Sequence, residues 1–198
     1  MDDTSTKFVI SLVSRDRTGI IRSIATAINE RNGNIEGMSQ TVFQGYFTVI
    51  LTAEFRESYH RNEIRELIEN CFSRDETSVI VRPFEEVRPR LGDILNDRYI
   101  LTLTGKDRPG ILKTLTAYLA ESNINIEDYY FTVQGDQVVH IGEVTIPKEV
   151  DIKQLQGELQ ALLSSSEFVV ALQHENLFRA TNDVFSVWQL LKVAKCEE

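Results

Sequence analysis

The chain has 198 residues, a net charge of −9 and a pI near 4.9. Its hydrophobic fraction of 42% and charged fraction of 26% are typical of a globular protein with a buried core. The acidic charge argues against direct nucleic-acid binding, because duplex affinity depends on Lys and Arg that neutralise phosphates. No apolar run approaches membrane-spanning length and no signal-peptide pattern opens the chain, so we expect no membrane partner and a cytoplasmic location.

An internal repeat divides the chain into two parts. The sequence DRTGIIRSIATAINERNGNIE starts at Asp16, and DRPGILKTLTAYLAESNINIE starts 91 positions later at Asp107. The Asp-Arg-x-Gly-Ile at the start of each stretch and the Asn-x-Asn-Ile-Glu at its end coincide in register. The repeat predicts two domains, 1–84 and 98–178, joined by a linker at 85–97 and followed by a C-terminal helix at 179–198.

The first repeat predicts the element order strand, helix, strand, strand, helix, strand. The expected ranges are Phe8–Ser14, Gly19–Arg31, Ile35–Val42, Tyr46–Phe55, a helix that buries Ile64 to Phe72, and Thr77–Arg82. Apolar residues alternate along Tyr46–Phe55, which indicates a sheet covered by helices on one face. Cys71 lies on the apolar face of its helix and is expected to fill the core.

The second repeat predicts the same order. The expected ranges are Tyr99–Gly105, Gly110–Ser122, Ile126–Val133, Val138–Ile146, a helix capped by Asp151, and Phe168–Gln173. His140 is assigned to the core or the sheet face. A last helix, Val184–Val193, is apolar all round and is expected to be buried against its own chain or a second copy, so a homodimer is expected.

Each Asp-Arg-x-Gly turn follows an apolar strand and begins a helix. Pro109 has its φ preset for a first helical position, and Thr18 can cap the helix at the equivalent place. The glycine leaves backbone N–H groups open, and a helix start of this kind attracts an anion such as a carboxylate. No catalytic motif accompanies these turns, and His60, His140 and His174 lie far apart without metal-ligand spacing. We therefore expect no enzyme activity, no metal and no cofactor.

With these turns and the downstream Asn-Ile-Glu, the chain resembles the ACT domain family, and within it the subgroup that includes the glycine cleavage system transcriptional repressor. The resemblance implies an α+β fold of two ferredoxin-like βαββαβ domains with antiparallel four-stranded sheets. It also implies a regulatory protein that senses a small amino acid and acts on a partner protein, in transcriptional regulation of amino-acid metabolism. The alternative is a dimerisation module or a detached regulatory subunit of an amino-acid-metabolism enzyme.

The candidate ligand-binding residues lie in the turn and at the next strand start of each repeat. They are Asp16, Arg17, Thr18, Gly19, Ile20, Asn34 and Ile35 in the first repeat, and Asp107, Arg108, Pro109, Gly110, Ile111, Asn125 and Ile126 in the second. The ligand carboxylate is expected on the turn N–H groups, and its ammonium on the Asp carboxylate or the Asn side-chain oxygen.

Structural alternatives exist for these residues. The Asp residues can cap the helices, the Asn residues can end them in the left-handed conformation, and the Arg residues can be solvated or paired with an acid. We expect the site at a seam between two ACT units, with Ile35–Val42 and Ile126–Val133 as the meeting sheet edges.

Overall fold

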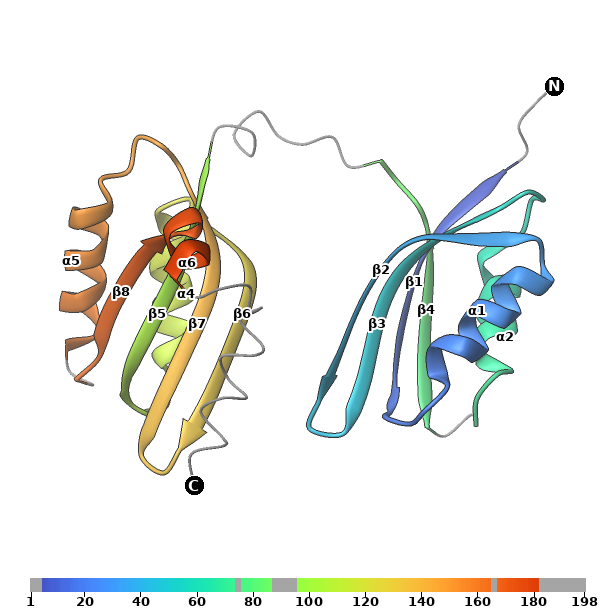
Figure 1. Cartoon of the computed structure of the whole chain (residues 1–198), viewed down its shortest axis with the longest axis horizontal. Helices are drawn as coiled ribbons and strands as arrows, with labels where there is room; N and C mark the ends of the chain where they lie inside the picture. The colour runs from blue at the N-terminus through green and yellow to red at the C-terminus, as the bar shows by residue number, and fades with distance from the viewer. Residues whose placement is uncertain (1–4, 74–75, 87–95, 165–166, 182–198) are drawn as a thin grey trace. The chain divides into compact units, whose positions relative to one another are not determined.

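The computed structural model describes residues 5–73, 76–86, 96–164 and 167–181. The chain divides into two compact units, Met1–Val87 and Arg88–Glu198 (Figure 1). The predicted helix Val184–Val193 and most of the predicted linker 85–97 lie outside the described residues, and the predicted domain boundaries stay a prediction. In the part of the chain that is described, no helix is long and apolar enough to cross a membrane.

The first unit has the predicted element order. Its elements are β1 (Thr6–Arg15), α1 (Ile20–Glu30), β2 (Gly33–Phe43), β3 (Tyr46–Phe55), α2 (Arg61–Glu69) and β4 (Thr77–Pro83). The strands form one antiparallel sheet in the order β2-β3-β1-β4, and both helices lie on the same face of it (Figure 1). This is the ferredoxin-like arrangement expected from the sequence.

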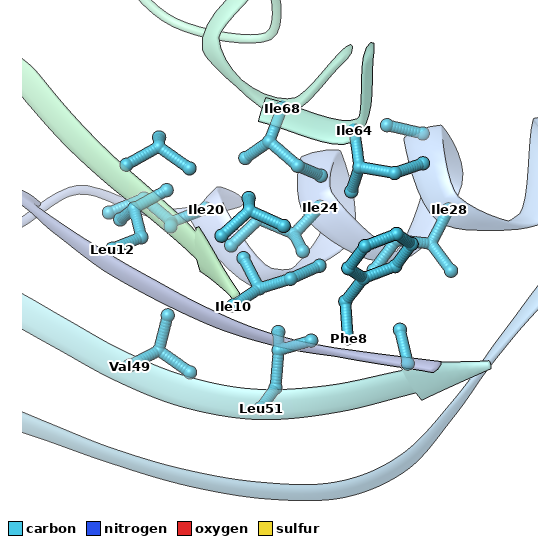
Figure 2. Packing of buried hydrophobic residues seen from close by; sticks show 14 of the residues in the cluster. Phe8, Ile10, Leu12, Ile20, Ile24, Ile28, Val49, Leu51, Ile64 and Ile68 are labelled. Carbon is cyan, nitrogen blue, oxygen red and sulfur yellow. The ribbon is translucent and has the colours of Figure 1, made fainter. Parts of the chain in front are cut away.

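The core of this unit fills the space between the sheet and its two helices. Phe8, Ile10 and Leu12 alternate along β1 toward the helices, because successive strand residues point to opposite faces. They meet residues spaced one helical turn apart, which are Ile20, Ile24 and Ile28 from α1 and Ile64 and Ile68 from α2 (Figure 2). Cys71 packs against this cluster, and burial raises the pKa of its thiol, which confirms it as a core residue.

The second unit repeats the arrangement. Its elements are β5 (Asp97–Lys106), α4 (Ile111–Glu121), β6 (Asn125–Gln134), β7 (Gln137–Ile146), α5 (Ile152–Leu162) and β8 (Val169–His174), with strand order β6-β7-β5-β8. The Asp151 carboxylate accepts hydrogen bonds from the backbone N–H groups of Lys153 and Gln154, as predicted for a helix cap. The edge strands are β2 and β4 in the first sheet and β6 and β8 in the second, and the predicted meeting of β2 with β6 stays a prediction.

A short helix follows β8 in the second unit. This helix, α6 (Glu175–Thr181), begins earlier than the C-terminal helix expected from the sequence. Glu175 lies in its first turn, where a negative charge is favourable, and His174 Nδ1 accepts a hydrogen bond from the N–H of Asn176. The helix contacts β5 and β8 (Figure 1). Ile100 of β5 lies on the sheet face opposite the core and is nevertheless only 4% exposed.

Candidate functional site

The two helix-start turns have almost the same backbone. Gly19 and Gly110 are the N-cap residues of α1 and α4, each with φ of 93°, in the left-handed region that glycine adopts without steric cost. A Cβ added at either glycine would have no atom within 4 Å, so the space beside each turn is open. The first N–H groups of a helix have no partner within it, although at the second turn the N–H of Ile111 donates to the carbonyl of Arg108 at 3.4 Å.

The structure corrects the predicted caps of these helices. Thr18 and Pro109 precede the N-cap glycine, so neither occupies a cap or first helical position. No side chain makes a cap hydrogen bond at either helix start in the described structure, which removes the alternative that Asp16 and Asp107 are caps. At both helix starts the left-handed backbone of the glycine turns the chain into the helix, at the position where a capping side chain usually stands.

Both turns are fixed to the neighbouring hairpin by one backbone hydrogen bond. The N–H of Asp16 donates to the carbonyl of Gly45 at 2.9 Å, and the N–H of Asp107 donates to that of Asp136 at 2.9 Å. The Asp side chains themselves are exposed, as are Arg17 and Arg108, whereas Ile20 and Ile111 are buried. The Arg17 guanidinium lies 5.5 Å from the centre of the Phe72 ring, which favours a packing role for this arginine over ligand binding.

The strand starts differ from the prediction in one detail. The residues in the left-handed conformation after the helices are Asn32 and Asn123, with φ of 53° and 55°, and not Asn34 and Asn125. Asn34 and Asn125 already belong to β2 and β6, where they are exposed, so the role of helix terminator is removed from them. Ile35 and Ile126 are half-buried and pack against the core of their units.

Within one unit, the turn and the strand start lie at opposite ends of the sheet. Asn34 pairs with Glu54 on β3, and Glu54 pairs with Lys7 near the beginning of β1, whereas Asp16 follows the last residue of β1. Eight residues separate Lys7 from Arg15, which at about 3.3 Å per residue is about 26 Å. A single unit therefore cannot supply both halves of the predicted site to one small ligand.

The strand start of the second unit is hollowed into a pocket of about 290 Å³, lined by Asn96, Arg98, Asn125, Glu127 and Thr145. A β-bulge between Ile126 and Asp128 adds Glu127 as an extra residue, so that its side chain reaches Thr145 on β7. Glu127 Oε1 accepts hydrogen bonds from Asn125 Nδ2 at 2.7 Å and Thr145 Oγ1 at 2.9 Å. These two bonds hold the pKa of Glu127 below its usual value, so the pocket contains a carboxylate.

Sequence reasoning selects only Asn125 from this pocket. Glu127 is part of the repeated Asn-Ile-Glu, so the motif could have identified it as a candidate site residue. Its hydrogen bond with Thr145 depends on the β-bulge, which the motif does not reveal. Thr145 comes from β7, Arg98 from the start of β5, and Asn96 directly precedes β5. Only the strand register brings these residues to Asn125.

His140 lies on the core face of β7, close to the turn of the second unit. Its ring stacks on Phe131 with centroids 5.3 Å apart, and its Nδ1 lies 2.9 Å from the Tyr129 hydroxyl. Its Nε2 is buried and has no hydrogen-bond partner in the described structure. Burial lowers the pKa of His140, and the Asp107 carboxylate partly opposes this shift.

This burial predicts a pH dependence of stability in the second unit. Since the folded pKa lies below the ordinary value of 6.5, the unfolded state binds more protons as the pH falls through 6.5. The stabilisation is thus complete above pH 6.5 and declines as the pH falls toward the folded pKa. Hydrogen exchange of β7 amides between pH 7 and 5 checks this, with rates corrected for intrinsic exchange. His140→Gln should flatten the dependence, and an unchanged slope in that variant would contradict it.

Two profiles of the ACT domain match the chain, at residues 8–69 and 97–173. The chain belongs to the ACT domain family. The second match spans β5 to β8, and the first spans β1 to α2, so each unit is one ACT domain. A UPF0237 protein of Methanopyrus kandleri is 36% identical over 88 residues, which are 44% of this chain and 98% of that protein.

Two solved structures superpose on most of the chain. A Galdieria sulphuraria protein superposes with a TM-score of 0.69 at 20% identity, over 86% of this chain and 98% of its own. A protein assigned as a glycine cleavage system transcriptional repressor superposes with a TM-score of 0.62 at 16% identity, over 85% of this chain and 96% of its own. At these identities the likeness shows the tandem ACT fold alone.

Proposed function

We propose that this tandem ACT protein is a non-catalytic sensor that binds a small amino acid and passes the signal to a partner protein. The observation that carries the proposal is the pair of open helix starts at Gly19 and Gly110, which recur with the same backbone in both ACT domains. A helix start offers free N–H groups and a partial positive charge, and both favour a carboxylate.

The ammonium group of the ligand needs a hydrogen-bond acceptor with a full or partial negative charge. Asp16 or Asp107 in the turn can provide a carboxylate, and Asn34 or Asn125 can provide a side-chain oxygen. Because the turn and the strand start of one unit are far apart, the Asn residues can contribute to a ligand at a turn only from a different ACT unit. Ligand occupancy would then change the packing of two units, which is the coupling that a sensor requires.

The open sheet face of the first unit supports a homodimer. Ile50 and Ile80 lie on the face opposite the core and are 52% and 57% exposed, whereas Ile141, which takes the place of Ile50 in the second unit, is 8% exposed. We propose that a second copy covers this apolar face. Light scattering of the full chain should give twice the mass of 22.6 kDa.

The acidic charge of the chain argues against direct nucleic-acid binding and so supports action through a partner protein, either a transcription regulator or an enzyme of amino-acid metabolism. We place this action in the cytoplasm as part of the proposal. The likeness to a glycine cleavage system transcriptional repressor agrees with the first of these.

A thermal-shift screen of the full chain against the twenty amino acids tests the proposed function. An amino acid that binds only the folded state stabilises it by RT ln(1 + [L]/Kd), about 2.7 kcal/mol at a concentration one hundred times Kd. A screen in which no amino acid raises the melting temperature would refute the sensor and leave the dimerisation module.

A further inference from the structure

The strand start, which forms a pocket in the second unit, differs between the two ACT units in the partner of its acid and at position 145, where Thr145 replaces Glu54 of the first unit. Three of its polar positions are related by the repeat: Lys7, Asn34 and Glu36 in the first unit correspond to Arg98, Asn125 and Glu127 in the second. Both units have the β-bulge at the acid, between Ile35 and Gly37 and between Ile126 and Asp128. The carboxylates of Glu36 and Glu127 therefore occupy equivalent places.

In the first unit this carboxylate already has an ammonium partner. Lys7 Nζ lies 2.5 Å from Glu36 Oε2, and both side chains are about one third exposed. The same ammonium lies 4.1 Å from the centre of the Phe84 ring, and the N–H of Phe84 donates to the Lys7 carbonyl at 2.8 Å. The lysine is thus held at Glu36 by an ion pair and by a cation–π contact.

In the second unit the corresponding cation pairs with a different acid. Arg98 Nη1 lies 3.1 Å from Glu143 Oε1, and Glu143 stands where the first unit has Thr52. Glu127 bonds only the neutral groups of Asn125 and Thr145 through Oε1, and its Oε2 has no hydrogen-bond partner in the described structure. Asn125 donates through Nδ2, which leaves its side-chain oxygen as a second acceptor.

We propose that the ammonium group of a small amino acid binds Glu127 and the Asn125 side-chain oxygen in this pocket, in the place that Lys7 takes in the first unit. Only the second unit then provides a working ammonium site, and the chain binds one amino acid per copy. The class of ligand rests on the proposed function. The choice of Glu127 and of the second unit rests on the ion pairs of the two strand starts.

Glu143 has a positioning role in this site. It engages the Arg98 guanidinium in an ion pair, although Arg98 is near enough to Glu127 to lower further the pKa of that carboxyl, and without Glu143 the guanidinium is free to pair directly with Glu127 as Lys7 pairs with Glu36. Glu143→Gln should therefore weaken ligand binding although residue 143 does not touch the ligand. Adding Arg98→Ala to Glu143→Gln should restore binding, because the competing cation is then gone.

Calorimetric titration of the full chain with each of the twenty amino acids tests the inference. For any amino acid that binds, Glu127→Gln should reduce the affinity at least tenfold, and Glu36→Gln, its match in the first unit, should leave the affinity unchanged. Both residues are exposed or partly exposed, and circular dichroism checks that each variant keeps its fold.

Three results would overturn the inference while leaving the sensor intact: full affinity in Glu127→Gln, an equal loss in Glu36→Gln, or two bound ligands per chain. Failure of Arg98→Ala to restore binding in the Glu143→Gln background would remove the positioning role. Absence of binding for all twenty amino acids would instead refute the proposed function itself.

Discussion

Replacing Phe168 with alanine is expected to lower the free energy of unfolding of the second unit by about 3–5 kcal/mol. Phe168 is 1% exposed, and its ring fills the space over Gly105, where an added Cβ would lie 2.7 Å from the Phe168 ring. His140 and Phe168 have ring centroids 5.9 Å apart. Removing the ring leaves a cavity over β5 that neighbouring side chains cannot close, since Gly105 has none.

Native-state hydrogen exchange measures this loss for the second unit by itself. Protection of β5 amides such as Leu103 should fall by about two to three and a half orders of magnitude, since 1.4 kcal/mol corresponds to about tenfold. Val169→Ala is the matched control, because Val169 is the next residue, is 67% exposed and points away from the core. Equal losses for the two variants would contradict the assigned packing.

Replacing both turn acids, Asp16→Ala with Asp107→Ala, is expected to weaken amino-acid binding by about tenfold or more, because the turn carboxylate of a different ACT unit is a further acceptor for the ammonium group that Glu127 and Asn125 bind. A hydrogen bond to a charged group contributes about 1.5–3 kcal/mol, and the helix-start N–H groups that receive the ligand carboxylate remain in place. Neither Asp caps its helix, so the folded structure should not change.

The companion variant replaces the strand-start amides, Asn34→Ala with Asn125→Ala. Calorimetry of both double variants against the unaltered chain separates the two halves of the site. A loss in only the Asn pair would assign the ammonium to the strand start, and a loss in only the Asp pair would assign it to the turn and overturn the Glu127 site. Undiminished affinity in both would place the ligand elsewhere on the molecule.

The repeat and its periodicities were sufficient to predict the fold. Apolar residues at helical spacing in Ile20–Ile28 and alternating apolar residues in β3 each depend only on local sequence and on burial of one face. Both patterns can therefore be recognised in the sequence without knowledge of any long-range contact. The first helical position of α4 was mispredicted because Pro109 suits such a position, whereas the left-handed Gly110 is the N-cap and the helix begins at Ile111, two residues after Pro109.

The site was predictable in part, and its limits have a physical cause. The turn residues are consecutive, so their proximity follows from the chain itself. Asn34 and Asp16 are also close in sequence, yet an intervening helix carries the chain to the far end of the sheet. Which acid pairs with Lys7 or Arg98 depends on whether the neighbouring strand carries a neutral residue, as at Thr52, or an acid, as at Glu143, and strand register alone brings those residues together.

Binding of a small amino acid is the property on which the proposed sensor depends. Calorimetric titration of each of the twenty amino acids into the full, unaltered chain tests it most directly. We expect saturable binding of at least one of them, at one molecule per chain. The absence of saturable heat for all twenty would contradict it.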